Sequence, residues 1–342
     1  MSRSVRVGAV ALTLSLASLA AVGCSGPATS TPQAAGDKAA EVVKVTSCGR
    51  QLSFTGAPKR AVTLDQSATE VLLELGLQDR MAGTSNLKTK IAPEYREAYG
   101  KVPVLSPKLL GGEQLRAAAP DLAVAGFNDH FTKDRAGTRE ELAALGLPTF
   151  LSAVDCPQQN AAGKSPFDLL LEDYRNLGKV FGVEERAEKL VRDQRAMLDK
   201  AAKDSAGVRG APRAVWVYSV YGDAPYVAGK TAMASEMSRI AGAKNAFDDL
   251  DEDWPSVTWE EVAKRNPDFI VVGDLSERGK PGDSAADKLA AIRGNPVMAQ
   301  LDAVRKNRFI TVPGTEMDPS VRTVDALPRL TAGMKALGHA GR

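Results

Sequence analysis

Two stretches of the chain share one pattern, and they decide the fold. EQLRAAAPDLAVAG occupies residues 113–126, and EEVAKRNPDFIVVG follows 147 positions later at residues 260–273, without a gap in the correspondence. Each stretch predicts a short helix, a Pro-Asp stop and a strand, because proline cannot extend a helix and biases the residue before it toward extended backbone. A continuous apolar run is typical of a strand buried on both faces of a parallel sheet. The chain therefore contains two similar α/β units.

Strand and helix signals on either side of these stretches complete two lobes, residues 44–160 and 211–342. In the first lobe, SATE at residues 67–70 predicts a capping box in which Ser67 begins a helix that ends near Gly76. The other expected elements are strands at 61–64, 81–84, 214–219 and 309–312 and helices at 234–241 and 321–337. The predicted fold class is α/β, with two Rossmann-like lobes joined by a single long interdomain helix and a ligand cleft between the lobes.

A helical connection at residues 165–204 joins the two predicted lobes. Residues 168–181 are amphipathic and stop at Gly182, and residues 184–204 carry spaced apolar positions among many charges. At 1.5 Å per residue, the second helix would span about 30 Å. A single helix of that length would act as a stiff strut and predicts a small closure of the lobes rather than a wide hinge. The alternative is a surface helix that belongs to one lobe.

The first residues carry a targeting pattern. Arg3 and Arg6 precede an apolar run at 7–22 that is shorter than the about 20 apolar residues of a membrane span. The run ends in AVGC, which resembles a bacterial lipobox, so we expect a signal peptide at 1–23 and a lipid on Cys24. Residues 24–43 are rich in small residues and proline and predict a flexible tether. The folded part is then extracytoplasmic and lipid-anchored to the cell membrane, and the alternative is an ordinary signal peptide.

Two further cysteines, Cys48 and Cys156, follow the tether. In an oxidising compartment a cysteine pair is more often bridged than free. We therefore expect a disulfide whose loop encloses the first lobe, with two unpaired thiols as the alternative.

Composition excludes several classes of function. The 342 residues suit about two domains, and 44% hydrophobic with 25% charged residues is typical of a globular core. The formal net charge is +2 and becomes zero once Arg3 and Arg6 are removed, so a nucleic-acid partner is not indicated. Two histidines, His130 and His339, are too few for a His-rich metal site.

Candidate ligand contacts follow the predicted strands. In open α/β sheets, ligands bind beyond the carboxyl ends of the strands, and polar and aromatic side chains there suit a small-molecule pocket. The candidate ligand-binding residues are Gln66, Ser85, Asn86, Asn128, His130, Tyr221, Trp254, Asp274, Glu316 and Arg322.

The ordered set of motifs resembles a known family. The lipobox, the opening PKRAVTL at 58–64, the helix start ATE at 68–70, the two Pro-Asp-strand units and the linking helix resemble class III substrate-binding lipoproteins of ABC importers. The resemblance covers about residues 46–337. It implies a receptor that binds a ferric siderophore or similar metal chelate and delivers it to permease subunits, without chemistry on the ligand. A haem or cobalamin receptor of the same importer type is the alternative, and we expect a monomer with no cofactor of its own.

The resemblance also implies that one acidic residue per lobe docks onto permease arginines. The matching positions are Glu113 and Glu260, which stand at the same place in the two repeated stretches. The structural alternative is that each glutamate only stabilises the dipole of its helix, by a few tenths to about 1 kcal/mol.

Competing motifs are incomplete. Residues 224–231 fit a relaxed phosphate loop, but Pro225 and Tyr226 are unsuited to backbone that wraps a phosphate. A calcium-loop spacing begins at Asp249, with Trp254 where glycine is normal. The chain has no Gly-x-Ser-x-Gly elbow, so we expect no enzyme. A free metal-ion receptor would need histidines and carboxylates that converge in the cleft, and histidines are scarce. A surface-anchored sensor or interaction protein without a transport role is the alternative from another class.

Overall fold

The structure is a computed structural model that describes residues 42–159 and 163–339. The predicted signal peptide, Cys24 and nearly all of the predicted tether lie outside the described residues. β1 (Val43–Ser47) begins at the last position of that tether and forms an antiparallel hairpin with β2 (Arg50–Phe54). Within the described ranges, no helix combines the length and the apolar character that a membrane crossing requires.

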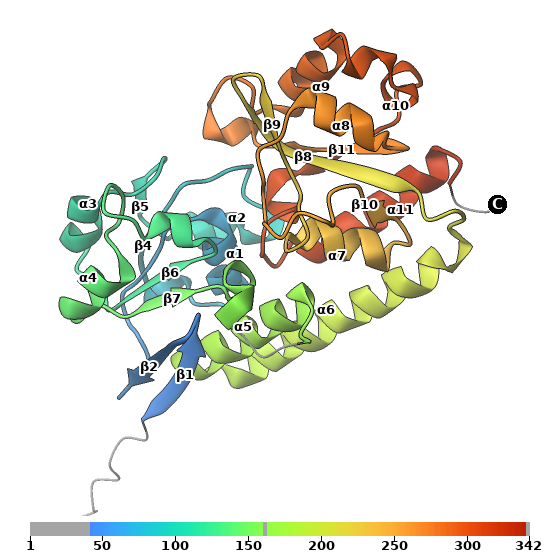
Figure 1. The fold of residues 1–342 in the computed structure, drawn as a ribbon. Helices are drawn as coiled ribbons and strands as arrows, with labels where there is room; N and C mark the ends of the chain where they lie inside the picture. Colours follow the sequence, from blue (N-terminus) through green and yellow to red (C-terminus); the bar gives the residue numbers. More distant parts are fainter. Residues whose placement is uncertain (1–41, 160–162, 340–342) are drawn as a thin grey trace, which may run out of the picture. The chain divides into compact units, whose positions relative to one another are not determined.

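The first lobe is built on a parallel sheet that, in the described chain, has five strands (Figure 1). Its order is β5 (Val104–Ser106), β4 (Met81–Ser85), β3 (Ala61–Thr63), β6 (Leu122–Ala125) and β7 (Thr149–Leu151). Every residue of β3, β6 and β7 is buried, as expected for parallel strands covered on both faces. All the carboxyl ends therefore meet at one edge.

α1 (Gln66–Glu74) follows β3, and the predicted capping box at Ser67 is wrong. Asp65 is the residue that caps the helix, because its Oδ1 accepts from the backbone N–H of Ala68 at 2.9 Å. Its Oδ2 accepts from the backbone N–H of Gly126 at 2.7 Å, so one buried carboxylate ties the helix to the end of β6. A serine two residues later cannot compete with a carboxylate that satisfies two backbone donors.

The second lobe repeats this arrangement. Its sheet has the order β10 (Lys244–Asn245), β8 (Arg213–Tyr221), β11 (Phe269–Asp274) and β12 (Phe309–Pro313), with β9 (Ala224–Val227) antiparallel to β8. β8 is longer than the predicted 214–219 because it continues into the hairpin with β9. Residues 224–231, which fit a relaxed phosphate-loop pattern, therefore start with strand β9 and not with a loop.

The two repeated stretches form equivalent joints. Asp121 lies after α3 (Gly112–Ala117), and its carboxylate accepts from the backbone N–H groups of Lys59 and Arg60, at 2.7 and 2.9 Å. Asp268 lies after α8 (Trp259–Arg265), and its carboxylate accepts from the backbone N–H of Arg213 at 2.7 Å. In each lobe the aspartate of the Pro-Asp stop therefore joins the repeated strand to the start of its neighbour.

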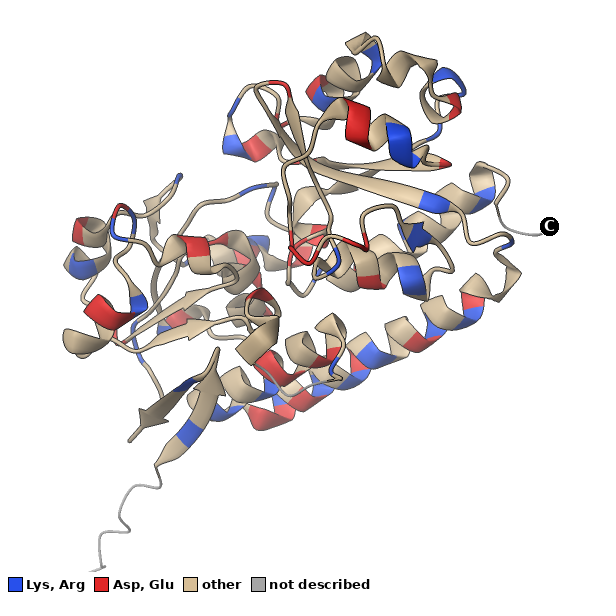
Figure 2. Ribbon diagram, in the orientation of Figure 1, with Lys and Arg blue, Asp and Glu red and all other residues tan. Residues whose placement is uncertain are grey.

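Two helices connect the lobes. α5 (Pro166–Phe181) ends at Gly182, whose φ of +67° is the left-handed backbone that glycine adopts without strain. α6 (Glu184–Asp204) has the predicted bounds, and acidic and basic residues alternate along it (Figure 2). Arg186 Nη1 donates to Leu75 O of the first lobe at 2.9 Å, and Gln194 Nε2 donates to Val321 O of the second lobe at 2.7 Å. α6 is therefore a strut that contacts both lobes.

The remaining helices cover the sheets. Their bounds are α2 (Arg96–Tyr99), α4 (Arg139–Ala144), α7 (Met233–Ile240), α9 (Ala285–Gly294), α10 (Asp302–Arg305) and α11 (Ala326–Ala336). α11 starts later than the predicted 321, because residues 323–325 form a separate 3₁₀ turn.

Cys48, in the turn between β1 and β2, forms a disulfide with Cys156, and the two Cα atoms lie 5.7 Å apart. The bridge closes a loop with a sequence separation of 108 residues that contains all five strands of the first sheet.

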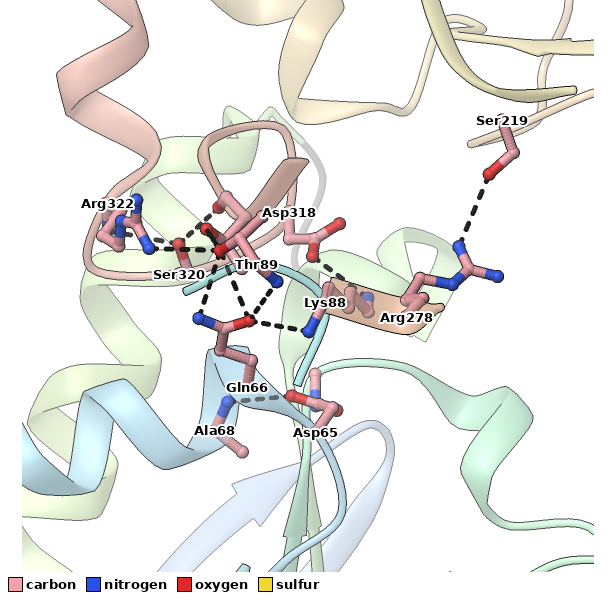
Figure 3. A network of polar contacts seen from close by, with 12 residues as sticks. Asp65, Gln66, Ala68, Lys88, Thr89, Ser219, Arg278, Asp318, Ser320 and Arg322 are labelled. Atoms are coloured by element: carbon pink, nitrogen blue, oxygen red, sulfur yellow. Dashed lines mark hydrogen bonds and ion pairs between the residues drawn. The ribbon is translucent and has the colours of Figure 1, made fainter. Parts of the chain in front are cut away.

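A polar bridge joins the two lobes where their strand ends meet (Figure 3). Lys88 follows β4, and its Nζ lies 3.0 Å from Oδ2 of Asp318, which follows β12. Both side chains are buried, with Lys88 7% and Asp318 0% exposed. Burial alone would lower the pKa of Lys88, but Asp318 and Tyr218 beside it outweigh that effect and raise the pKa. Lys88 is therefore a permanently charged ammonium between the lobes.

Two further contacts complete the bridge. Arg322 Nη1 lies 3.4 Å from Glu70 Oε1, and the hydroxyls of Thr89 and Thr315 are 3.1 Å apart. Gln66 accepts from the backbone N–H groups of Lys88 and Thr89 at 2.8 and 2.9 Å, which holds the first-lobe loop in position.

We expect reduction of the disulfide to lower the free energy of unfolding by about 2–4 kcal/mol, because a crosslink restricts the unfolded chain. Urea denaturation with and without dithiothreitol measures this. Cys48→Ser with Cys156→Ser should show the lowered stability under both conditions. A denaturation midpoint that does not respond to the reductant would contradict the expectation.

Lys88→Met should destabilise the protein by about 3–5 kcal/mol, because it leaves the Asp318 carboxylate buried without its partner. Adding Asp318→Asn should restore part of the loss, and urea denaturation provides the values. Lys101→Met is the matched control, since Lys101 pairs with Glu97 at 3.1 Å on the surface and such pairs contribute about 0–1 kcal/mol. Equal stability of Lys88→Met and Lys101→Met would show that the bridge does not hold the lobes.

Candidate ligand-binding site

A cavity of about 750 Å³ lies at the carboxyl ends of the strands and is lined by both lobes. The first lobe contributes the loops after β4, β5 and β6, and the second lobe contributes β8, β9 and the loops after β10 and β11. Both sheets therefore present to one space the edge at which α/β folds bind ligands.

The cavity is rich in cations. Among the described residues, five lining side chains are basic and one is a carboxylate, Asp129. The basic residues are Lys88, Lys108, Arg135, Arg278 and Lys280. Burial opposes the ionisation of Asp129, yet His130 and Arg135 beside it hold its pKa below the usual range. Arg135 Nη1 lies 2.5 Å from Asp129 Oδ2, so the carboxylate is paired within the wall. The cavity can thus attract a ligand that carries negative charge.

Aromatic rings form much of the remaining wall. Tyr218 and Trp254 stack with ring centroids 4.6 Å apart, and Tyr221 meets Tyr226 edge to face at 5.3 Å. Lys88 Nζ lies 4.1 Å from the centroid of the Phe127 ring, a cation–π distance. Paired rings are rigid apolar surfaces that lose little freedom when a ligand packs on them.

His130 lies in the wall but faces the protein. It is 4% exposed, and its Nε2 lies 3.4 Å from Oδ2 of Asp65 and 3.8 Å from Oδ1 of Asp129. Burial lowers the pKa of His130, although Asp65 and Asp129 beside it oppose the effect. In the described ranges, no group of three or more His, Cys, Asp or Glu side chains could hold a metal ion. The calcium-loop carboxylate Asp249 instead pairs with Arg265, with Oδ2 at 2.9 Å from Nη2.

Four of the ten candidate ligand contacts lie in the cavity wall. These are Asn86, His130, Tyr221 and Trp254. Tyr221 is the most open of the phenols that line it, at 38% exposure.

Three of the other candidates belong to the bridge or its surroundings. Gln66 and Arg322 make the contacts described above, and Arg322 Nη1 also lies 3.3 Å from the hydroxyl of Thr89. Glu316 is 1% exposed, and its Oε2 lies 3.0 Å from Nε of Arg329. Burial raises the pKa of Glu316 to about 7.

The last three candidates make hydrogen bonds to neighbouring parts of their own lobes. Ser85 donates to Thr63 O at 3.3 Å, and Asp274 Oδ1 accepts from the N–H groups of Ser276 and Ala285 at 3.2 Å each. Asn128 donates its backbone N–H to Asp155 at 2.6 Å and lines a smaller neighbouring pocket of about 300 Å³. These residues do not line the main cavity.

The basic residues of the cavity were missed by the sequence analysis. Lys88 and Lys108 stand two or three residues beyond strand ends, and Arg278 and Lys280 stand further along the loop after β11. A signal for these cavity residues was available in the sequence, because basic residues recur after the ends of four strands, β4, β5, β6 and β11. Strand β5 was not predicted, so Lys108 could not be placed at a strand end.

Glu113 and Glu260 lie in the first turns of α3 and α8 and are exposed. In the part of the chain that the structure describes, neither carboxylate has an ion-pair partner. Thr258 caps α8 through its hydroxyl, which accepts from the N–H of Glu261 at 3.1 Å, so Glu260 is free for another partner.

Known proteins are similar to this chain in sequence and in fold. A substrate-binding lipoprotein of an ABC transporter from Bacillus subtilis, named YvrC and described as uncharacterized, is 26% identical over 330 residues, which cover 95% of this chain and 94% of the relative. A vitamin B12-binding protein of Yersinia pestis is 27% identical over 220 residues, or 63% of this chain and 70% of the relative. The solved structure of an ABC-type Fe3+-hydroxamate transport system from Saccharomonospora viridis has 25% identity and a TM-score of 0.72 over 85% of this chain and 98% of that chain.

The predicted fold class is confirmed, since the structural relative shares the two α/β lobes and their linking helix. The resemblance drawn from the sequence is confirmed as well. Residues 62–315, most of the chain, match the family described as periplasmic binding protein. The chain belongs to the periplasmic binding protein family.

Proposed function

We propose that this protein is the extracytoplasmic substrate-binding component of an ABC importer and captures an anionic metal chelate, a ferric siderophore first of all. The observation that carries the proposal is the lining of the cavity, in which the described residues supply five basic side chains, and two of them, Lys108 and Lys280, have no ion-pair partner in the described chain. A volume of about 750 Å³ suits a chelate of drug-like size or larger. The aromatic pairs would pack against the organic part of the ligand.

The relatives support the proposal. The Bacillus relative is named as a substrate-binding lipoprotein of an ABC transporter, and the Saccharomonospora structure is titled as an Fe3+-hydroxamate transport system. A lipid on Cys24 would anchor the protein at the outer face of the membrane, within reach of permease subunits. The protein performs no chemistry on the ligand in this role.

Two other ligands fit less well. Cobalamin would use the aromatic walls, and the Yersinia relative is named as a vitamin B12-binding protein. Lys108 and Lys280, which have no ion-pair partner among the described residues, would then face no matching negative charge. Haem would need an axial ligand, but Nε2 of His130 faces two carboxylates. A sensor without a transport role would not need two unpaired glutamates at equivalent helix starts.

Ligand binding is tested with probes that differ in charge. The anionic tris complex of ferric iron with 2,3-dihydroxybenzoate should quench tryptophan fluorescence through Trp254 and bind at micromolar concentration or below. The cationic ferric complex of desferrioxamine B and neutral cyanocobalamin should bind at least about tenfold more weakly. Affinity for the anionic probe should fall as salt rises, because the basic side chains are partly exposed.

A charge-matched pair of variants provides the control. Lys108→Gln with Lys280→Gln removes one cation from each side of the cavity and should weaken the anionic probe roughly tenfold at low salt. Lys203→Gln with Lys335→Gln removes two exposed cations on α6 and α11 and should leave binding unchanged. Equal loss in both variants, or tighter binding of the cationic probe, would refute the proposed ligand charge.

Permease docking is tested by reversing both candidate charges. Glu113→Arg with Glu260→Arg should abolish uptake into cells while ligand binding by the purified protein persists, because the glutamates lie outside the cavity. Glu184→Arg with Glu185→Arg is the control, since it makes the same charge change in the exposed first turn of α6. Transport that survives the first double change would remove the docking assignment.

A further inference from the structure

We infer that Asp283 is a positioning residue that holds the guanidinium of Arg278 toward the cavity, where Arg278 contacts the negative part of the ligand. The inference rests on the proposed function for its ligand. It assigns a role to a residue that does not line the cavity.

Arg278 is held on three sides. It ends a 3₁₀ turn, η7 (Ser276–Arg278), that follows β11. Its Nη1 donates to the hydroxyl of Ser219 at 3.4 Å (Figure 3), and its Nη2 donates to the phenol oxygen of Tyr221. Its Nε lies 3.2 Å from Oδ2 of Asp283. Ser219 and Tyr221 belong to β8, so the side chain is fixed against a strand on one side and a buried carboxylate on the other.

Asp283 is buried within the second lobe. It is 0% exposed, and within the described ranges its carboxylate oxygens accept no hydrogen bond, so the ion pair with Arg278 is its closest polar contact. Its backbone carbonyl accepts from Lys288 Nζ at 2.7 Å and from the N–H of Leu275 at 3.0 Å. Lys288 therefore anchors the main chain of Asp283 and leaves the carboxylate to Arg278.

This arrangement leaves donors for a ligand. A guanidinium has five N–H groups, and the hydrogen bonds to Ser219 and Tyr221 use one on each terminal nitrogen, while Nε faces Asp283 in an ion pair. One N–H on each terminal nitrogen is left, and such donors can bind the oxygens of a carboxylate or catecholate. A side chain that is already ordered loses less entropy on binding.

The direction in which one substitution changes the affinity for an anionic ligand separates a positioning role of Asp283 from a purely electrostatic one. Asp283→Asn removes a negative charge behind the cavity, so a purely electrostatic role predicts tighter binding of an anion. A positioning role predicts weaker binding, by roughly tenfold, because Arg278 is released from its orientation. In an Arg278→Gln background, the same substitution should cause no further weakening. The probe is ferric tris(2,3-dihydroxybenzoate), measured by tryptophan fluorescence.

Side-chain NMR supplies a readout that needs no ligand. The Nε–H signal of Arg278, assigned by its loss in Arg278→Lys, should exchange slowly with water, and Asp283→Asn should accelerate that exchange. Fast exchange in the wild type, or equal or tighter probe binding by a folded Asp283→Asn protein, would overturn the inference. If the wild type binds no anionic probe although the exchange is slow, the proposed function fails while the contact between the two residues stands.

Discussion

One buried ammonium and one buried carboxylate, Lys88 and Asp318, meet where the two sheets face each other. Parallel strands bring their polar carboxyl-end loops to one edge, so two such lobes that face each other must satisfy many polar groups away from water. The Lys88–Asp318 pair meets that requirement at the centre, with Thr89 and Thr315 beside it. The cavity lies next to this ion pair, and Lys88 both pairs with Asp318 and lines the cavity.

The polar residues near the strand ends thus divide into two groups. One group, which includes Gln66, Glu70 and Arg322, is buried or partly buried and forms or supports the contacts between the lobes. The other group, which includes Arg278, Lys280 and the aromatic pairs, faces the cavity. Burial raises the pKa of the Glu70 carboxyl, and Arg322 beside it opposes the effect. The cavity combines basic side chains with rigid rings, an arrangement suited to holding a ligand rather than transforming it.

The sequence predicted the framework well, because strong local signals specify it. The bounds of α6 follow from its spaced apolar positions after Gly182, and the two Pro-Asp stops mark equivalent joints. The helix cap at Ser67 was wrong because the competing cap, Asp65, also binds Gly126, a residue distant in sequence. The candidate site was predicted only in part, since strand ends supply both the lobe contacts and the cavity wall. Whether Arg322 or Arg278 faces the ligand depends on the path of the opposite lobe, and no local pattern in the sequence records that path.

The most direct test of the account is a crystal structure of the protein with an anionic ferric chelate bound. The account predicts the chelate between the two lobes, with its negative oxygens on Arg278 and neighbouring basic side chains and its organic part on the rings of Tyr218 and Trp254. The iron should be fully coordinated by the chelate. A chelate bound outside the cavity, or an iron coordinated directly by protein side chains, would contradict the account.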